Sequence, residues 1–333
     1  MGGNDILKLS IRFIDIIRCN GIIIMNMATT EGKLWLNGEM VEQPDAKIHV
    51  LTHSLHYGIA VFEGVRAYQT DDGRTAIFRL DDHTDRLLGS AKIFQLDVPY
   101  DKETFNQAQK DVIKQNGFDS AYLRPLIWIG AEKLGLSSRG NSINAMVAAW
   151  KWGAYLGEEG IQKGIRVKTS SYTHHMTNVT MCKAKAASNY PVSIMANQEV
   201  TRSGYDEAIL MDPQGYVCQG SGENLFLVKN GELHTPDLGG GALDGITRRT
   251  IIQFAEDLGI KVVERRITRD EFYLADEIFM TGTAAEVTPI REYDDRVIGN
   301  GGRGEITEKL QSLYFDVIHG RNEQYMHWLS FVD

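Results

Sequence analysis

The sequence contains little cysteine and no run of basic residues. Its 333 residues include only three cysteines, Cys19, Cys182 and Cys218. An odd number without CxxC spacing argues against a disulfide framework and against a zinc site, and it fits a reducing cytoplasm. The formal net charge is -9, so nucleic acid and anionic membrane surfaces are disfavoured as partners. These absences favour a small metabolite as the ligand and predict a cytoplasmic location.

Long apolar runs and several widespread enzyme motifs are also absent. The most apolar stretch, Ile11 to Met25, contains four charged or amide residues and is too short to span a bilayer. A signal peptide is the alternative, but no small-residue cleavage site follows. We expect residues 1–27 to form an N-terminal extension outside the fold. P-loop and serine-hydrolase functions are disfavoured because GxxxxGK(S/T) and GxSxG do not occur.

The length of the chain predicts two domains, since 333 residues exceed what one hydrophobic core usually organises. Periodicity stops after Trp152, where glycines cluster, as is typical of a connection between domains. We therefore predict a small N-terminal domain at 28–151, an interdomain loop at 152–160 and a large C-terminal domain at 161–333. Strands and helices mix without strict alternation, which predicts α+β domains rather than one doubly wound sheet.

Local patterns predict the individual elements. Asn37-Gly38 favours a tight hairpin turn within residues 33–41. Helices are expected at 82–94 and 101–115, each opened by a capping aspartate. Further helices are expected at 191–203, 248–258 and 306–319. The remaining strands are expected at 60–67, 75–79, 122–129, 145–151, 166–170, 207–211, 216–219, 224–228, 232–235, 261–265 and 277–281.

Lys185 is the first candidate for chemistry. It stands among small residues ahead of a helix whose first residue can be Pro191. A lysine amine can form a Schiff base with an aldehyde cofactor and can later carry a proton. Taken alone, a lysine is far more often a solvated surface residue.

Two loops could hold a phosphate group. Gly245-Ile246-Thr247 leads into a helix, whose first amides favour anions, and Thr281 to Ala285 is a small-residue loop with hydroxyl groups. Each is also compatible with an ordinary helix start or turn. By composition, Gly220 to Asn224 is typical of a turn that connects two strands, and Arg86 is typical of a solvated helix residue. The histidines at 53 and 56 are better interpreted as structural residues than as metal ligands.

Taken together, these segments resemble the branched-chain amino acid aminotransferases, the fold type IV group of pyridoxal-phosphate enzymes. The resemblance runs from about Lys33 to the C-terminus and rests on several motifs in one order. These are His56-Tyr57-Gly58, Val61-Phe62-Glu63-Gly64-Val65-Arg66, Ser120-Ala121-Tyr122-Leu123-Arg124-Pro125, Trp152-Gly153-Ala154-Tyr155-Leu156-Gly157, Ala184-Lys185 before Asn189-Tyr190, Gly220-Ser221-Gly222-Glu223-Asn224-Leu225-Phe226, Gly245-Ile246-Thr247-Arg248 and Thr281-Gly282-Thr283-Ala284-Ala285-Glu286.

The resemblance implies a site for pyridoxal 5'-phosphate. Lys185 would bond to the cofactor, Arg86 would hold its phosphate and Tyr190 its ring hydroxyl. The amides of Ile246 and Thr247 and the hydroxyl of Thr283 would complete the phosphate site, with Leu243 and Glu223 nearby. No metal is implied.

The resemblance also implies a substrate pocket. Its members would be Tyr57, Phe62, Gly64, Arg66, Tyr122, Trp152 and Tyr155, with the loop Thr283, Ala284 and Ala285 for the α-carboxylate. Such an aromatic box suits a branched aliphatic side chain. Arg124 would receive the distal carboxylate of glutamate. The implied substrates are leucine, isoleucine, valine, glutamate and their 2-oxo acids. Tyr57 is implied to come from a neighbouring subunit, so a homodimer is the minimum and a homohexamer the larger alternative.

One position departs from the family pattern. Counting from Lys185 without a gap, the glutamate that pairs with the pyridine nitrogen falls on Gln219. A neutral amide cannot supply the charge stabilisation of a carboxylate. Either the pyridinium is weaker and the reaction slower or altered, or the nearby Glu223 replaces the missing carboxylate.

Two other functions remain open at this level. D-amino acid transaminases and aminodeoxychorismate lyases share the scaffold, although Arg124 and the aromatic box favour branched-chain substrates. A protein that binds the cofactor without catalysis is the second alternative, and Gln219 is the only residue that favours it.

Overall fold

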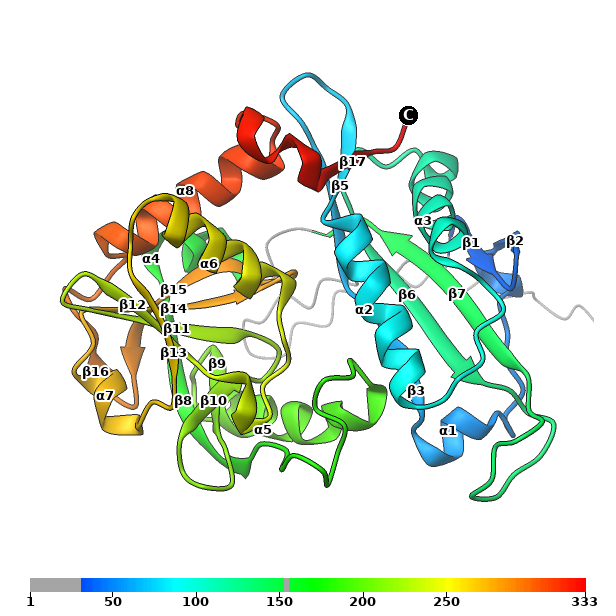
Figure 1. Cartoon of the computed structure of the whole chain (residues 1–333), viewed down its shortest axis with the longest axis horizontal. Coiled ribbons are helices and arrows are strands. Elements are labelled where there is room, and N and C mark those ends of the chain that lie inside the picture. Colours follow the sequence, from blue (N-terminus) through cyan, green and yellow to red (C-terminus); the bar gives the residue numbers. More distant parts are fainter. Residues whose placement is uncertain (1–30, 153–155) are drawn as a thin grey trace, which may run out of the picture.

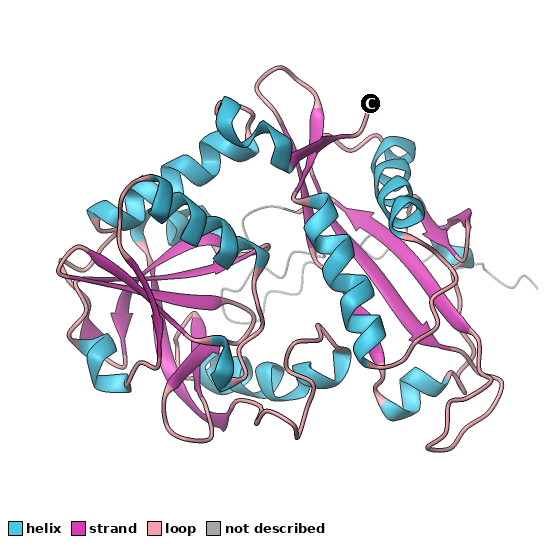
Figure 2. Cartoon of the chain, in the orientation of Figure 1, coloured by secondary structure: helices cyan, strands magenta, loops and turns pink. Residues whose placement is uncertain are grey.

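The computed structural model describes residues 31–152 and 156–333. The predicted extension at 1–27 and Tyr155 lie outside the described residues. Two sheets with different topologies form the frame of the molecule, and helices pack on both (Figure 1). The mixture of helices and sheets confirms the predicted α+β class (Figure 2).

The first sheet is antiparallel throughout. Its neighbouring strands, in order, are β17 (Leu329–Phe331), β5 (Thr75–Phe78), β4 (Val65–Gln69), β6 (Ala121–Ile129), β7 (Ile143–Trp150), β1 (Lys33–Leu36) and β2 (Glu39–Glu42), and β3 (Ala60–Phe62) pairs with β6. Helices α2 (Leu80–Ile93) and α3 (Lys102–Asn116) pack on it, and α1 (His53–Tyr57) lies at one end (Figure 1). The predicted hairpin turn is confirmed, since Asn37 and Gly38 both have positive φ, 49° and 99°.

The start of α2 differs from the prediction. The helix begins at Leu80 rather than Asp82, and its N-cap is Arg79 in the left-handed region, with no side-chain cap. The side chain of Arg79 donates to Asp82 at 2.6 Å, so the aspartate binds an arginine instead of the helix amides. The other predicted cap is confirmed, because Asp101 accepts a hydrogen bond from the amide of Thr104 at 2.9 Å.

The predicted strand 60–67 is two strands, β3 and β4, separated by Glu63 and Gly64. The backbone turns there to contact other segments. The amide of Phe62 donates to the carbonyl of Lys185, and the amide of Glu63 donates to the carbonyl of Pro125. A single strand was the wrong prediction because these long-range bonds leave no trace in the local pattern.

The second sheet is mixed and carries most of the loops that form the cavity described below. Its neighbouring strands, in order, are β10 (Val217–Gly220), β9 (Glu207–Met211), β8 (Ile165–Thr173), β15 (Glu286–Tyr293), β14 (Glu277–Gly282), β11 (Asn224–Lys229), β12 (Glu232–Pro236) and β13 (Val262–Arg265), and β16 (Arg296–Val297) pairs with β15. The helices of this half are α4 (Gly157–Lys163), α5 (Tyr190–Arg202), α6 (Ile246–Asp257), α7 (Arg269–Tyr273) and α8 (Glu305–Ile318).

Two features link the halves. The final strand, β17, pairs with β5 of the first sheet, Leu329 opposite Phe78. One hydrophobic cluster combines Phe78 of the first sheet with Phe254 of α6 and Tyr314 of α8. Part of the predicted loop 152–160 is helical, because α4 begins at Gly157. The division into domains at this loop stays a prediction. Within the described residues, no helix is both long enough and apolar enough to cross a membrane.

Candidate functional site

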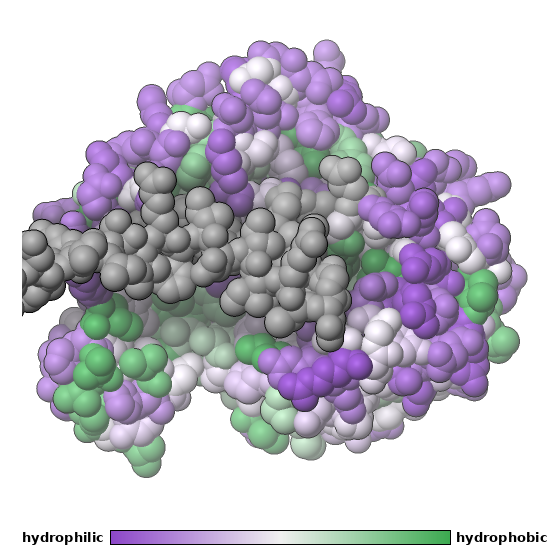
Figure 3. All heavy atoms as spheres, turned by 180° about the vertical axis from the view of Figure 1, so that it is seen from behind, coloured by the Kyte–Doolittle hydropathy of each residue, from purple (hydrophilic) through white to green (hydrophobic). Residues whose placement is uncertain are grey.

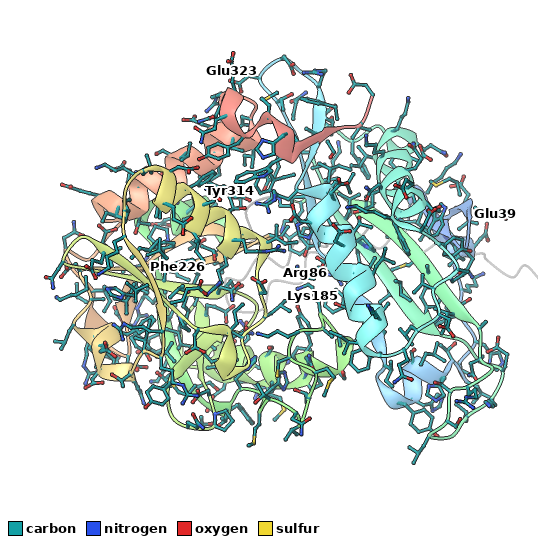
Figure 4. All side chains as sticks on the ribbon, viewed as in Figure 1. Glu39, Arg86, Lys185, Phe226, Tyr314 and Glu323 are labelled. Carbon is teal, nitrogen blue, oxygen red and sulfur yellow. The ribbon has the colours of Figure 1, made fainter. Side chains whose placement is uncertain are left out.

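One cavity is lined by residues of α2 from the first half and by residues of several loops from the second. Figure 4 shows Arg86 and Lys185 close together between the two halves. All nine residues that the resemblance assigned to the cofactor line this one cavity, namely Arg86, Lys185, Tyr190, Gln219, Glu223, Leu243, Ile246, Thr247 and Thr283.

Lys185 is partly buried and held from several sides. Its Nζ donates to the hydroxyl oxygen of Tyr190 at 2.8 Å, and it lies 5.2 Å from the centre of the Phe62 ring. The backbone is fixed as well, since its amide donates to Ser90 at 3.0 Å and its carbonyl accepts from Phe62. The position therefore holds a restrained amine in the cavity rather than a solvated surface lysine.

Arg86 projects from α2 and is anchored by a buried carboxylate. Its Nε and Nη2 donate to Glu63 at 2.6 and 2.9 Å, and its Nη1 donates to the carbonyl of Asp244 at 2.8 Å. Burial alone would raise the pKa of Glu63, but Arg86 and His83 outweigh it and hold that pKa well below its usual range. Since a guanidinium has five N–H donors, these three bonds orient Arg86 and leave donors for an anion.

The N-terminus of α6 forms the other part of the anion site. Its N-cap, Gly245, supplies no side-chain cap, so the first amides of this 12-residue helix stay available. A Cβ at Gly245 would lie 1.9 Å from Oδ1 of Asn224, so only glycine allows this close packing. Buried in the same wall, the hydroxyl of Thr281 lacks a partner among the described residues. A restrained amine, an oriented guanidinium and free helix amides around one cavity fit a phosphorylated aldehyde cofactor.

The polar wall formed by β10 and the turn after it carries Gln219 and Glu223. The amide of Leu243 donates to Oε1 of Gln219 at 3.1 Å. Glu223 is buried, and its Oε2 accepts from the amide of Gly222 at 3.0 Å. Burial, reinforced by the neighbouring carboxyl of Glu207, raises the pKa of Glu223 to about 8. At neutral pH Glu223 is therefore mainly uncharged.

Aromatic rings gather beside this cavity. The ring of Tyr122 lies 4.5 Å from Trp152 and 5.4 Å from Trp150, and the guanidinium of Arg124 lies 4.7 Å from the Phe62 ring. Phe62 in turn contacts Tyr190, with 4.9 Å between ring centres, and so connects the aromatic cluster to the cofactor wall. The buried Nε of Arg124 has no partner among the described residues. Trp150 was not predicted from the sequence.

Of the predicted substrate residues that the structure describes, only Thr283 lines the cavity itself. Two others, Gly64 and Arg66, support the aromatic cluster beside it. A Cβ at Gly64 would lie 1.9 Å from the hydroxyl oxygen of Tyr122, so glycine makes room for that ring. Arg66 is buried and pairs with Glu286 at 3.0 Å. Glu286 has a left-handed φ of 55° directly after Ala285, so this ion pair fixes the end of the loop that carries Thr283.

Tyr57 does not join the other predicted substrate residues within this chain. It is 42% exposed and packs against His53 in a tilted arrangement, with 4.6 Å between ring centres. The histidines of α1 have structural roles, as expected: His53 hydrogen-bonds the carbonyl of Gly135 and His56 that of Val50. Among the described residues, no group of three or more metal-ligating side chains could hold a metal ion.

Comparison with known proteins decides the family. The family model for amino-transferase class IV matches residues 60–293, a span that contains nearly all of the residues described above. The chain belongs to the class IV aminotransferases. It is therefore an enzyme, and enzymes of this class depend on pyridoxal phosphate.

Several relatives of this class IV aminotransferase cover almost its full length. It is 52% identical over 308 residues to the branched-chain-amino-acid aminotransferase of Pseudomonas aeruginosa, covering 92% of this chain and 100% of that protein. The enzyme of that name from Escherichia coli K12 is 44% identical over 301 residues, which are 90% of this chain and 97% of that one.

Solved structures agree. The Escherichia coli branched-chain amino acid aminotransferase superposes with a TM-score of 0.89 at 43% identity, covering 91% of this chain and 100% of that one. The branched-chain amino acid aminotransferase of Thermobaculum terrenum, in its PLP-form, superposes with a TM-score of 0.86 at 33% identity, covering 92% of this chain and 100% of that chain.

The buried Glu223 of this aminotransferase gives a first testable prediction. A carboxyl whose pKa is raised in the folded state binds its proton more tightly when folded, so stability falls as pH rises from about 4.5 to about 8. Glu223→Gln removes this pH-dependent loss of stability. The free energy of unfolding of the variant, relative to that of the parent protein, should therefore increase by roughly 3 kcal/mol between pH 5 and pH 8.5. Urea unfolding of the cofactor-free proteins at both pH values measures the difference. Equal pH dependence in the two proteins would contradict the raised pKa.

Proposed function

We propose that the chain is a branched-chain amino acid aminotransferase, which moves the amino group of leucine, isoleucine or valine to 2-oxoglutarate and gives the branched 2-oxo acid and glutamate. One observation carries this proposal. Lys185 Nζ donates a hydrogen bond to Tyr190 in a cavity that is bounded by the N-terminus of α6 and lies next to an aromatic cluster containing Arg124. The names of the relatives and of the solved structures support the same activity.

The residues of the cavity suit pyridoxal 5'-phosphate. When bound, this cofactor supplies an aldehyde that condenses with amines and a ring that withdraws electrons from the substrate. Arg86, the amides of Ile246 and Thr247, and the hydroxyl of Thr283 would hold its phosphate. Tyr190 would hold the ring hydroxyl and, through the bond to Nζ, keep Lys185 directed towards the reacting centre.

Lys185 supplies the proton transfer. Its Nζ takes the proton from the substrate Cα as a general base and later returns it as a general acid. The neighbouring rings of Phe62 and Tyr190 limit the access of water to Nζ. The amine therefore exchanges its proton with the substrate rather than with solvent. The Thr283–Ala285 loop, fixed at its end by the Arg66–Glu286 ion pair, would bind the α-carboxylate.

The aromatic cluster and Arg124 account for the two kinds of substrate. The rings of Phe62, Tyr122 and Trp152 offer apolar surface for a branched side chain, and the guanidinium of Arg124 offers donors for the distal carboxylate of glutamate. A planar guanidinium can lie against a ring face while no acidic substrate is present. One pocket can therefore accept both substrates in turn.

Arg124→Met tests this division of labour. The change should lower kcat/KM for 2-oxoglutarate by about 10- to 100-fold, because a charge-assisted contact is lost. The half-reaction with leucine should change only a few-fold, since methionine keeps an apolar surface. Stopped-flow measurement of the two half-reactions separates the effects, and an equal loss in both would contradict a carboxylate-binding role.

A homodimer is part of the proposal. Apolar side chains gather on the lobe around α1 (Figure 3), and we name Ile48, Val50, Leu51, Leu55 and Tyr57 the α1 patch; each is at least 42% exposed. Such a patch favours a protein partner, and a second copy would bring its Tyr57 to the aromatic cluster. Sedimentation at micromolar concentration tests the dimer. The low cysteine content supports a cytoplasmic location for the enzyme.

A spectrum tests the function as a whole. Purified protein should carry a visible cofactor band that changes when leucine is added and returns when 2-oxoglutarate follows. D-alanine and aminodeoxychorismate, added separately, should leave the band unchanged. A response to either of these instead of leucine would favour the related transaminases or lyases that share the scaffold.

A further inference from the structure

The side-chain amide of Gln219 has a fixed orientation. The backbone amide of Leu243 donates to it at 3.1 Å, and a backbone N–H can only donate, so the atom that faces Leu243 is the oxygen. Within residues 31–152 and 156–333, Nε2 of Gln219 has no acceptor. Gln219 therefore offers the cavity a hydrogen-bond donor rather than an acceptor.

The strand that carries Gln219 is irregular at this point. The pairing of β10 with β9 shifts its register between Val217 and Gln219, and such a bulge re-aims the side chains beside it. Gln219 lines the same cavity as Lys185, Tyr190 and Thr247. The local backbone thus directs a neutral donor into the proposed cofactor site.

The arrangement of groups on the cofactor indicates which of its atoms Nε2 of Gln219 would contact. In pyridoxal phosphate the ring nitrogen lies across the ring from the aldehyde carbon, whose partner here is Lys185. The ring hydroxyl and the phosphate arm flank that carbon, and Tyr190 and the α6 N-terminus match them. By elimination, the ring nitrogen would face the polar wall formed by β10 and the turn after it, which carries Gln219 and Glu223.

The charges around the cavity disfavour a protonated ring nitrogen. Of the described residues that line it, Glu223 is the only acidic one, and burial and the Glu207 carboxyl raise its pKa to about 8, so it is mainly neutral at pH 7. The pKa of Glu207 is itself raised by burial. Arg86 contributes positive charge. These lining residues therefore supply no carboxylate that would stabilise a pyridinium.

The remaining titratable neighbours do not change this balance. Burial, with a smaller effect of His175, lowers the pKa of His174 to about 3, so its imidazole is neutral. His175 hydrogen-bonds the carbonyl of Asn189 through Nε2. Cys218 precedes Gln219 and contacts His174, and burial raises the pKa of its thiol far above neutrality.

We propose that Gln219 donates a hydrogen bond from Nε2 to the pyridine nitrogen of the bound cofactor and holds that nitrogen unprotonated. The inference rests on the proposed function, because it requires pyridoxal phosphate at Lys185. A neutral ring withdraws electrons less strongly than a pyridinium. Removal of the Cα proton by Lys185 Nζ then limits turnover more than it would opposite a carboxylate. Glu223 does not substitute for the missing carboxylate, since in the cofactor-free protein it is mainly uncharged at neutral pH.

Reconstitution with pyridoxal phosphate labelled with ¹⁵N in the ring tests the inference directly. The ¹⁵N chemical shift of the holoenzyme at pH 7.5 should be that of a neutral, hydrogen-bonded pyridine. In Gln219→Glu it should move to the pyridinium range. Gln115→Glu, the same change on the exposed face of α3, should leave it unaltered. Gln219→Met should keep the nitrogen neutral but shift its signal to that of a pyridine without a hydrogen bond.

A kinetic measurement gives a second readout. With leucine deuterated at Cα, the parent enzyme should show a primary isotope effect on turnover, and Gln219→Glu should show a smaller one. A pyridinium signal in the parent enzyme, or a neutral signal that persists in Gln219→Glu, would overturn the inference while transamination leaves the proposed function intact. Protein that binds no pyridoxal phosphate, or binds it without converting leucine, would overturn the proposed function as well.

Discussion

Lys185→Ala is expected to abolish both the visible cofactor band and transamination. The substitution removes the amine that would bond to the cofactor and carry the proton, and the Tyr190 hydroxyl that accepts from Nζ at 2.8 Å cannot replace it. The loss of turnover should be on the order of 10⁴-fold or more. Absorbance of the reconstituted protein and coupled assays with leucine measure the two effects.

Two further variants make this result specific. Lys185→Arg keeps the positive charge but cannot form the bond to an aldehyde, so it should lose the band as completely as the alanine variant. Lys114→Ala, which removes an exposed lysine of α3, should retain full activity. The assignment would be wrong if Lys185→Ala kept the band and converted leucine.

Arg86→Met is expected to destabilise the fold and to weaken cofactor binding at the same time. Glu63 is fully buried and ion-paired to Arg86, so removal of the guanidinium leaves a buried carboxylate whose remaining partners are His83 at 2.8 Å and the amide of Gly64 at 3.3 Å. Breaking a buried pair in this way costs about 3–5 kcal/mol. Urea unfolding of the cofactor-free protein measures this cost, and titration with pyridoxal phosphate measures the loss of affinity.

A double variant separates the two roles of Arg86. Glu63→Gln combined with Arg86→Met removes the unpaired charge, so most of the lost stability should return. Cofactor affinity should stay low, because the arginine donors for the phosphate are still missing. Recovery of affinity together with stability would show that Arg86 acts only through the fold.

Local signals were sufficient for the elements that depend on neighbouring residues. The Asn37-Gly38 turn and the Asp101 cap were predicted because their stabilising contacts span two to four residues. Strand β15 was missed, although it lies between β8 and β14. It contains Pro289, which cannot donate to a neighbouring strand, and it begins with Glu286 at a left-handed φ, so its local propensity is poor.

The site shows the same contrast. Local patterns made Lys185 and Thr247 candidates, the role of Arg86 came from the resemblance alone, and the structure places all three around one cavity. The burial of Glu63 beneath Arg86 was not predictable, because its two side-chain partners lie 20 and 23 residues along the chain. Likewise, no local pattern reports that Leu243 fixes the amide of Gln219. Contacts of this kind exist only after the chain has folded.

The pairing of β17 with β5 also bears on how the protein is made. Leu329 to Phe331 form the edge strand next to residues that were synthesised some 250 positions earlier. During translation the first sheet therefore lacks this edge strand until residues 329–331 have been synthesised. The sheet of the earlier half therefore cannot be complete before the later half has been made, so the two halves do not fold as fully independent units.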